Sequence, residues 1–347
     1  MKDQPNENDA PVSKIADLRT GAGDALPTDP FFIVGSGRSG STMLRMMLCA
    51  HSRLTIPPET WFLLPLVERF SLDRTLDAAE IESAVSIMTQ HYRWPDMKLE
   101  AQEVRRKLSQ VTAPYLRNVI EVVYRLYLES EGKARWGDKT PIYIEIVPQL
   151  TRMFPNSRFI HLVRDGRDVA KSHQAAGWYG RWLHDNTREW TRALEFNHRW
   201  ASSEFHKRIL QVRYEQLVME PEATLREICY FIGEEFEPGM LSWERQVDEL
   251  VPARERRIHT KLKSRAGPDA VSRWKREMTA RELFVAEAFM GEHLSRAQYE
   301  RRYPGPLWKP AFALTRLYCH TALPTFDMYL RAIRFLRRRL APRLGLK

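Results

Sequence analysis

The fold is decided by residues 31–42, which have the sequence FFIVGSGRSGST. The first four residues of this stretch form a short apolar run between Pro30 and Gly35, and such a run predicts a buried β-strand. A helix is expected to begin at Ser41. Between the two, glycines let backbone N–H groups turn toward an anion, and the helix N-terminus adds the positive end of its dipole. The stretch therefore predicts a strand, a phosphate-binding loop and a helix.

The spacing of the loop is G-x-x-x-x-G followed by Ser-Thr, which is the spacing of a Walker A loop. Ser41 stands where a Walker A loop has its lysine, and the cation within this loop is Arg38. We expect the anion to be held by the loop and the first helical residues, namely Gly37, Arg38, Ser39, Gly40, Ser41 and Thr42.

A second strand followed by a polar turn and a helix is predicted at residues 158–172, where the sequence from 159 is FIHLVRDGRDVAKS. Arg164 stands at the carboxyl end of the predicted strand Arg158–Val163, and Ser172 lies two helical turns further on. An arginine and a hydroxyl that converge on one place suit a second phosphate. A solvated charged turn is the alternative interpretation of the same residues.

A third strand is predicted at Ile209–Val212, and residues 61–132 show apolar positions at helical spacing with breaks near Pro95 and Pro114. Strands that alternate with helices indicate a parallel sheet whose ligand-binding loops follow the carboxyl ends of the strands. We therefore expect an α/β, P-loop-like three-layer fold with a central parallel sheet flanked by helices. The domain prediction is a flexible leader at 1–28, a main domain at 29–305 and a basic helical extension at 306–347.

Two further segments carry cations. Residues 136–141, WGDKTP, predict a compact turn that places Lys139 between two helical stretches. The stretch 254–265 is basic and predicts either a surface loop or a mobile lid over an anionic ligand, with Lys263 or Arg265 reaching the ligand.

Composition narrows the class of protein. The net charge is +10, but residues 331–347 supply seven cations and no acidic residue, so global charge indicates little about ligands. The three cysteines are far apart and predict neither a zinc site nor a disulfide framework. The first residues lack the basic start and apolar stretch of a signal peptide, so a soluble cytoplasmic protein is expected.

The C-terminal segment has apolar residues at helical spacing from Phe326 to Leu340, with arginines between them. Such a basic amphipathic helix suits either the inner surface of an anionic membrane or the body of the protein itself. Nucleic acid is not an expected partner, because no recognisable motif accompanies the charge.

Taken together, residues 31–274 resemble the sulfotransferases that use 3′-phosphoadenosine-5′-phosphosulfate (PAPS), and most closely the tyrosylprotein branch. The segment RSGSTMLR from Arg38 looks like the 5′-phosphosulfate loop of that family, and VRDGRDVAKS from Val163 looks like its 3′-phosphate motif. The resemblance nominates Glu59 and Lys139 as catalytic residues, and it places Tyr214 near the nucleotide.

The sequence also departs from the family pattern. Gly37 stands where the family often has proline, and Trp61 stands where the tyrosylprotein branch has an arginine after its catalytic Glu-Thr. Peptide tyrosine is therefore one candidate acceptor beside a glycan, a lipid and a small molecule. Aromatic residues that could clasp an acceptor are concentrated in 61–128 and 178–200.

The mechanism implied by the resemblance makes Glu59 the general base, with burial expected to raise its pKa, while Arg38 and Lys139 neutralise the charge that develops. No metal ion is expected. Arg164, Ser172 and either Lys263 or Arg265 would hold the 3′-phosphate. His51 is the next candidate for the base.

Two other enzyme classes compete. The loop also satisfies G-x-G-x-x-G, and Glu59 stands about twenty residues on, where an NAD(P)-dependent oxidoreductase has its ribose-binding acid. A small-molecule kinase is the second alternative, because Asp165 follows an apolar run as a Walker B acid does. The absent loop lysine argues against the kinase.

Overall fold

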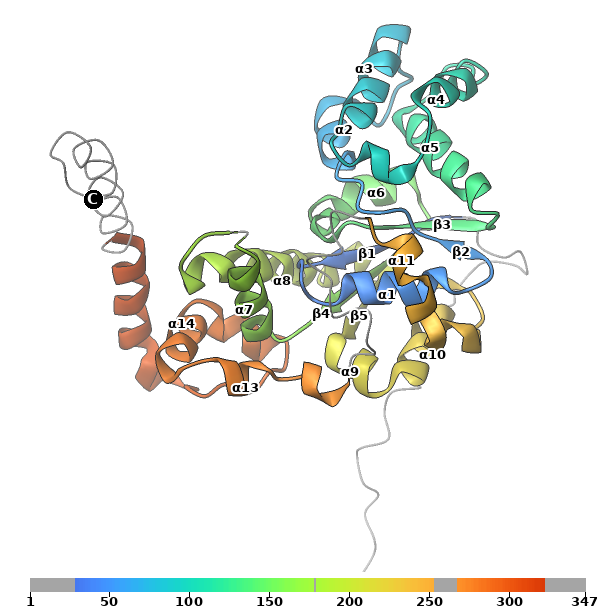
Figure 1. Cartoon of the computed structure of the whole chain (residues 1–347). Coiled ribbons are helices and arrows are strands. Elements are labelled where there is room, and N and C mark those ends of the chain that lie inside the picture. Colours follow the sequence, from blue (N-terminus) through green and yellow to red (C-terminus); the bar gives the residue numbers. More distant parts are fainter. Residues whose placement is uncertain (1–28, 178, 253–266, 322–347) are drawn as a thin grey trace, which may run out of the picture. The chain divides into compact units, whose positions relative to one another are not determined.

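The computed structural model describes residues 29–321, except Trp178 and 253–266 (Figure 1). The chain divides into two compact units, one with the described residues of 29–164 and 193–271 and the other with those of 165–192 and 272–321. Within these described ranges, no helix has the length and apolar character needed to cross a membrane. The predictions for the leader and for the basic helix at Phe326–Leu340 lie outside the described residues.

The first unit is built on a five-stranded parallel sheet with the order β2-β3-β1-β4-β5. Its strands are β1 (Phe31–Gly35), β2 (Leu54–Thr55), β3 (Arg135–Lys139), β4 (Arg158–Val163) and β5 (Ile209–Arg213). The predicted strands at 31–34, 158–163 and 209–212 are thus confirmed. The position of β1 between β3 and β4 differs from the 3-2-1-4-5-6 order of the dinucleotide-binding fold and argues against the oxidoreductase.

The predicted turn at 136–141 is wrong in its first half, because Arg135–Lys139 is the buried strand β3 and only Thr140 and the residues after it turn away. The strand pairs with β1 in register, with Ile33 opposite Lys139. Its charged residues concealed it from a hydropathy argument.

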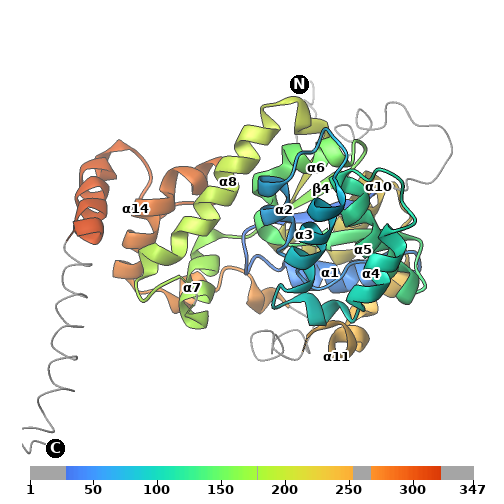
Figure 2. The ribbon, with the colours of Figure 1, turned by 90° about the horizontal axis from the view of Figure 1, so that it is seen from above.

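Both faces of the sheet are covered by helices, and the alternation of side chains along β1 shows how (Figures 1 and 2). Phe32 and Val34 pack into one apolar cluster, whereas Phe31 and Ile33 pack into the other. The first cluster is covered by α2 (Leu63–Arg69), α3 (Ala78–Thr89), α4 (Ala101–Leu108), α5 (Leu116–Ser130) and α6 (Val147–Met153). The second is covered by α1 (Ser41–Cys49), α9 (Tyr214–Met219), α10 (Pro221–Ile232) and α11 (Val247–Leu250).

The helical character of 61–132 is confirmed, and the prolines interrupt it as expected. Pro95 lies in a 3₁₀ turn, Trp94–Met97, and Pro114 directly precedes the N-cap of α5. The other 3₁₀ turns of this unit are Pro141–Ile146, Glu204–Arg208, Pro238–Gln246 and Pro268–Ala270. The three-layer α/β architecture is therefore as predicted.

The second unit is helical. It contains α7 (Gly166–Ala176), the start of α8 (Arg188–Ala201), α13 (Trp274–Glu277), α14 (Ala280–Arg296), the 3₁₀ turns Leu183–Thr187 and Pro306–Trp308, and helical residues 309–321. Arg167 is buried within it, paired with Asp165 at 2.8 Å and Glu287 at 3.0 Å, and its guanidinium lies 3.6 Å from the centre of the Trp274 ring. Asp165 also caps α7 through the Arg167 N–H. These contacts give Asp165 a structural role in place of the Walker B role of the kinase hypothesis.

Candidate active site

The candidate site lies at the carboxyl edge of the sheet, as parallel topology predicts. The loop 36–40 follows β1, Lys139 ends β3, Arg164 follows β4 and Tyr214 follows β5. Because these strands are neighbours and parallel, segments that are distant in the sequence meet along one edge. This geometry brings together four of the sequence elements that carried the functional prediction.

The glycine loop is shaped by close approach of a neighbouring ring. Gly40 is the N-cap of α1 and has φ = 95°, a left-handed conformation that side chains disfavour. A Cβ at this position would lie 2.4 Å from the ring of Tyr214. Arg38 also has a positive φ, 64°, so the chain curls tightly between β1 and α1. The loop and the ring of Tyr214 are therefore fitted to each other.

The loop also has the chemistry of an anion site. Its backbone leads into the N-terminus of α1, where N–H groups without intrahelical partners point outward. Ser39 Oγ is buried and has no hydrogen-bond partner among the described residues. Arg38 adds a half-buried cation. A phosphate or sulfate oxygen would satisfy these donors.

Arg164 links the two predicted phosphate motifs. Its Nη1 lies 3.5 Å from the Arg38 carbonyl oxygen, and its guanidinium lies 4.4 Å from the centre of the Tyr214 ring. Its Nη2 donates to the Ala270 carbonyl at 3.0 Å. Although 126 residues separate Arg164 from Arg38, the two motifs meet through Tyr214 and the loop backbone.

Lys139 is buried, with 2% of its side chain exposed. Its ammonium lies 2.5 Å from Glu59 Oε1 and 3.4 Å from Thr42 Oγ1 in the first turn of α1. The two residues nominated as catalytic by resemblance are therefore in direct contact beside the loop 36–40.

Glu59 lies four residues beyond β2 and is held from three sides. Lys139 contacts one carboxylate oxygen, while the other accepts a hydrogen bond from Trp61 Nε1 at 2.8 Å and lies 3.6 Å from Arg93 Nη2. Burial alone raises the pKa of Glu59, but the attraction of Lys139 and Arg93 outweighs burial and lowers that pKa to about 2. The expectation of a raised pKa is thus wrong, because two cations stand beside the carboxylate.

Sequence reasoning did not assign the other partners of Glu59 to the site. Trp61 has φ = 58°, a left-handed backbone conformation that is rare for a bulky residue, and this conformation accompanies its hydrogen bond to Glu59. Arg93 comes from the turn before Pro95, within the aromatic-rich range 61–128 that was expected to clasp an acceptor, but no sequence pattern singles it out. Among these partners, only Trp61 had a distinguishing feature in the sequence, which is its departure from the family pattern.

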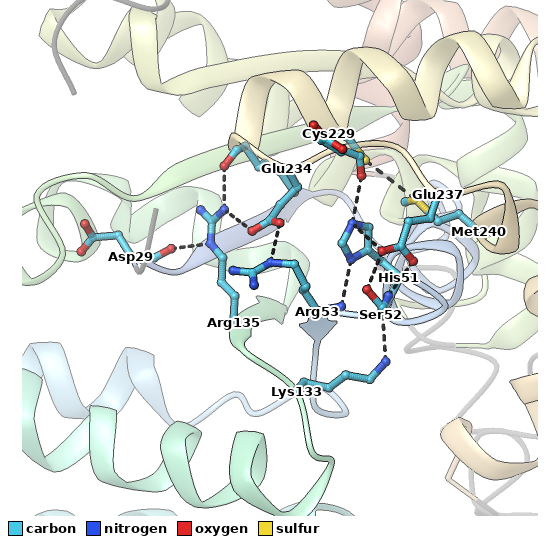
Figure 3. Close-up of polar contacts among 12 residues, drawn as sticks. Asp29, His51, Ser52, Arg53, Lys133, Arg135, Cys229, Glu234, Glu237 and Met240 are labelled. Atoms are coloured by element: carbon cyan, nitrogen blue, oxygen red, sulfur yellow. Dashed lines mark hydrogen bonds and ion pairs between the residues drawn. The ribbon is translucent and has the colours of Figure 1, made fainter. Parts of the chain in front are cut away.

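His51 does not belong to this site. It follows the C-terminus of α1, whereas the loop 36–40 precedes the N-terminus of that helix. Its Nε2 contacts the Glu235 carbonyl at 2.9 Å, and its Nδ1 accepts from the Arg53 N–H at 3.0 Å (Figure 3). The prediction that His51 is the next candidate for the general base is therefore wrong.

A polar cluster around His51 joins β2 and β3 to the segment after α10 (Figure 3). Glu234 pairs with Arg53 at 3.1 Å and with the buried Arg135 at 3.2 Å, and Glu237 accepts from the Ser52 N–H at 2.8 Å. Arg135 Nη1 also donates to the Ile232 carbonyl. This cluster anchors the edge of the sheet and accounts for Arg135, the first of the charged residues that conceal β3 in the sequence.

The remaining predicted ligands of the 3′-phosphate stay predictions. Ser172 lies in α7, in the second unit, and Lys263 and Arg265 lie outside the described residues.

Comparisons with known proteins agree with the arrangement at this edge. Residues 30–238 match the model of a protein family described as the sulfotransferase family. Protein-tyrosine sulfotransferase 2 of Gallus gallus is 27% identical over 209 residues, covering 58% of this chain and 50% of that protein. Protein-tyrosine sulfotransferase A of Caenorhabditis elegans is 27% identical over 228 residues, covering 63% and 54%.

The chain thus spans about half the length of the curated relatives it matches. Among solved structures, the sulfotransferase domain from the Synechococcus PCC 7002 olefin synthase has the same fold, with a TM-score of 0.55 and 23% identity. The match covers 82% of this chain and 98% of that domain. Because the family model covers more than half of the chain, this chain belongs to the sulfotransferase family.

Proposed function

We propose that this chain transfers the sulfuryl group of PAPS to a hydroxyl acceptor and releases 3′-phosphoadenosine-5′-phosphate (PAP). The observation that carries the proposal is the contact of Glu59 with Lys139 beside the first turn of α1. A carboxylate and a buried ammonium next to an anion-binding loop supply a proton acceptor and a charge stabiliser at one place.

The donor is assigned to the loop and its neighbours. The N–H groups of the loop, Arg38 and the N-terminus of α1 take the 5′-phosphosulfate end. Arg164 takes the 3′-phosphate, supported by its contact with the backbone of Arg38 and by its stacking on Tyr214. Recognition of two phosphates distinguishes PAPS from nucleotides that have none at the 3′ position.

The chemical step is an in-line displacement at sulfur. The acceptor oxygen forms a bond to sulfur, its proton passes to the Glu59 carboxylate, and the bond between sulfur and the 5′-phosphate oxygen breaks. PAP departs with the electron pair of that bond. Lys139 and Arg38 stabilise the negative charge that grows on the departing oxygen.

The low pKa of Glu59 shapes this proposal. A carboxylate with a pKa of about 2 is ionised at neutral pH, but it attracts a proton weakly while Lys139 neutralises it. Negative charge on the donor attracts the same ammonium. As that charge grows on the departing oxygen, the Lys139–Glu59 attraction weakens, and the basicity of Glu59 rises when the proton must be taken.

The acceptor is proposed as a hydroxyl of a phenol, peptide tyrosine, glycan or lipid. The named relatives are protein-tyrosine sulfotransferases, which favours a phenolic hydroxyl. Trp61 and Arg93 border Glu59, and for this reason we expect their side chains to meet the acceptor.

The test uses the full chain with ³⁵S-labelled PAPS and a panel that contains 4-nitrophenol, a tyrosine peptide, a sugar alcohol and a long-chain alcohol. Label should pass to at least one of the four, and calorimetry should show binding of PAP but not of NAD(P) or Mg-ATP. A chain that neither binds PAP nor labels any of the four contradicts the proposal.

A further inference from the structure

We propose that the buried carboxyl of Asp138 positions Glu59, through the hydroxyl of Thr60, and so makes Asp138 and Thr60 positioning residues for the reaction. This inference rests on the proposed function, in which Glu59 is the base. It assigns a role to a polar cluster on the opposite face of β3 from Lys139.

The cluster is a chain of hydrogen bonds in the interior. Asp138 Oδ2 accepts from Thr60 Oγ1 at 2.9 Å and from Tyr124 Oη at 2.7 Å. Thr60 Oγ1 lies 2.8 Å from Tyr143 Oη, which accepts from the Leu63 N–H at 3.1 Å. At most 2% of Asp138, Thr60, Tyr124 or Tyr143 is exposed.

Counting hydrogens fixes the direction of the chain. Thr60 has one hydroxyl hydrogen, and donation of this hydrogen to Asp138 leaves its oxygen to accept from Tyr143. The Leu63 N–H then donates to Tyr143, Tyr143 to Thr60, and Thr60 to Asp138. Asp138 is the terminal acceptor, so the whole chain depends on its carboxyl group.

This chain of hydrogen bonds fixes the backbone segment that carries Glu59. Thr60 is the next residue after Glu59, and its backbone N–H donates to Thr140 Oγ1 at 3.1 Å. Leu63 begins α2 just beyond. The side chains that hold this segment belong to Asp138, Thr140 and Tyr143. Lys139, which lies between them in the sequence, contacts the Glu59 carboxylate.

Residues 138–143 therefore hold Glu59 in two ways: Lys139 contacts its carboxylate, and the neighbouring residues bind Thr60, the next residue in the chain. Side chains alternate across a strand, so Lys139 reaches the catalytic face while Asp138 reaches the opposite face. A shift in Thr60 moves Glu59 relative to Lys139. Burial raises the pKa of Asp138 to about 6, which marks the carboxyl as a costly group to keep in the interior.

The test compares two hydroxyl deletions on the same carboxylate oxygen. Thr60→Val removes the link between Asp138 and the Glu59 segment, and Tyr124→Phe removes the other donor to Asp138 Oδ2, from helix α5. Tyr124 Oη also lies 3.2 Å from Thr60 Oγ1, but its one hydrogen is donated to Asp138, so Tyr124→Phe leaves the hydrogen bond from Thr60 to Asp138 in place. Phenylalanine keeps the stacking of residue 124 on Trp136, whose ring centre lies 4.1 Å away. Thr60→Ser keeps the hydroxyl and serves as the conservative rescue.

With the panel acceptor that is labelled, Thr60→Val should lower kcat by about 10- to 100-fold, because small displacements of catalytic groups have effects of this size. The KM for PAPS should change by less than about twofold, since the donor loop is untouched. Tyr124→Phe and Thr60→Ser should remain within about threefold of the parent in both constants. Equal losses in Thr60→Val and Tyr124→Phe would reduce the cluster to a structural role and overturn the inference.

Crystal structures of the variants give a readout that needs no turnover. In Thr60→Val the distance between Lys139 Nζ and Glu59 Oε1 should lengthen, whereas in Tyr124→Phe it should keep its parental value. An unchanged contact in Thr60→Val overturns the inference even if the parent enzyme is active. If the parent neither binds PAP nor transfers label, the proposed function fails, and the structures still decide the positioning role. Should Thr60→Val not fold, Tyr143→Phe interrupts the same chain one residue earlier and takes its place.

Discussion

Lys139 Nζ and Glu59 Oε1 lie 2.5 Å apart, joining the end of the third strand to a residue eighty positions earlier in the chain. The contact buries an ammonium that has only 2% of its side chain exposed. It also reverses the effect of burial on Glu59, whose pKa falls to about 2. The pair is thus held in a resting state in which each group neutralises the other.

Replacing Glu59 by glutamine should lower turnover by about 10²- to 10⁴-fold, the usual contribution of a general base. Binding of PAP, measured by calorimetry, should persist because the loop and Arg164 remain. Glu237→Gln is the matched control, since Glu237 is also a hydrogen-bonded glutamate with a lowered pKa but lies in the cluster around His51. Turnover of Glu59→Gln within tenfold of the parent would remove Glu59 from the mechanism.

Replacing Asp138 by asparagine should change how stability depends on pH. Burial raises the pKa of Asp138 from 3.8 to about 6, so the folded state holds a proton that the unfolded state has lost between these values. The parent therefore loses about 3 kcal/mol of stability in all, at 1.36 kcal/mol per pKa unit, as pH rises from well below 4 to well above 6.

Asparagine has no such proton, and urea unfolding at pH 4 and pH 7.5 measures the difference. The free energy of unfolding of Asp138→Asn, relative to that of the parent, should rise by about 2 kcal/mol between the two pH values, because the unfolded carboxyl is already partly ionised at pH 4. A difference that is constant with pH would show that Asp138 does not titrate in this range.

Replacing Gly40 by alanine should be more damaging than the same change at Gly132. Both glycines have positive φ, 95° and 62°, but a Cβ at Gly132 meets nothing within 4 Å, whereas one at Gly40 meets Tyr214 at 2.4 Å. Gly132→Ala should cost about 1–2 kcal/mol of unfolding free energy from backbone strain alone.

Gly40→Ala should cost a further 1–3 kcal/mol or so from overpacking and should also weaken PAP binding. Thermal unfolding and calorimetry check both expectations. Equal losses of stability in the two variants, with PAP affinity unchanged, would show that the ring of Tyr214 does not shape the loop.

Much of the fold was predictable because three strands are apolar and bounded by turn residues, as Phe31–Val34 illustrates. Strand β3 was not predictable, because Arg135, Asp138 and Lys139 make its sequence resemble that of a polar turn. Those charges are satisfied only in three dimensions, where Arg135 meets Glu234 and Lys139 meets Glu59. Local hydropathy carries no information about such distant partners.

The site shows the same limit. Glu59 and Lys139 were nominated by resemblance, and the structure places them in contact. The sign of the pKa shift at Glu59 was wrong because sequence reasoning counted burial and did not foresee Arg93 beside the carboxylate. Neither the sequence around Arg93 nor that around Tyr143 contains a pattern that would have assigned them to the site.

The central claim is that the turns led by Arg38 and Arg164 hold the two phosphate ends of one adenosine. Calorimetry of Arg38→Ala and Arg164→Ala with PAP, adenosine 5′-phosphate and adenosine 3′-phosphate tests it most directly. Arg164→Ala should weaken PAP by about 10- to 100-fold, as for a lost charge-assisted hydrogen bond, and leave adenosine 5′-phosphate unchanged. Arg38→Ala should weaken PAP and adenosine 5′-phosphate but spare adenosine 3′-phosphate. If either variant weakens all three nucleotides equally, or none of them, the two arginines do not hold opposite ends of one molecule.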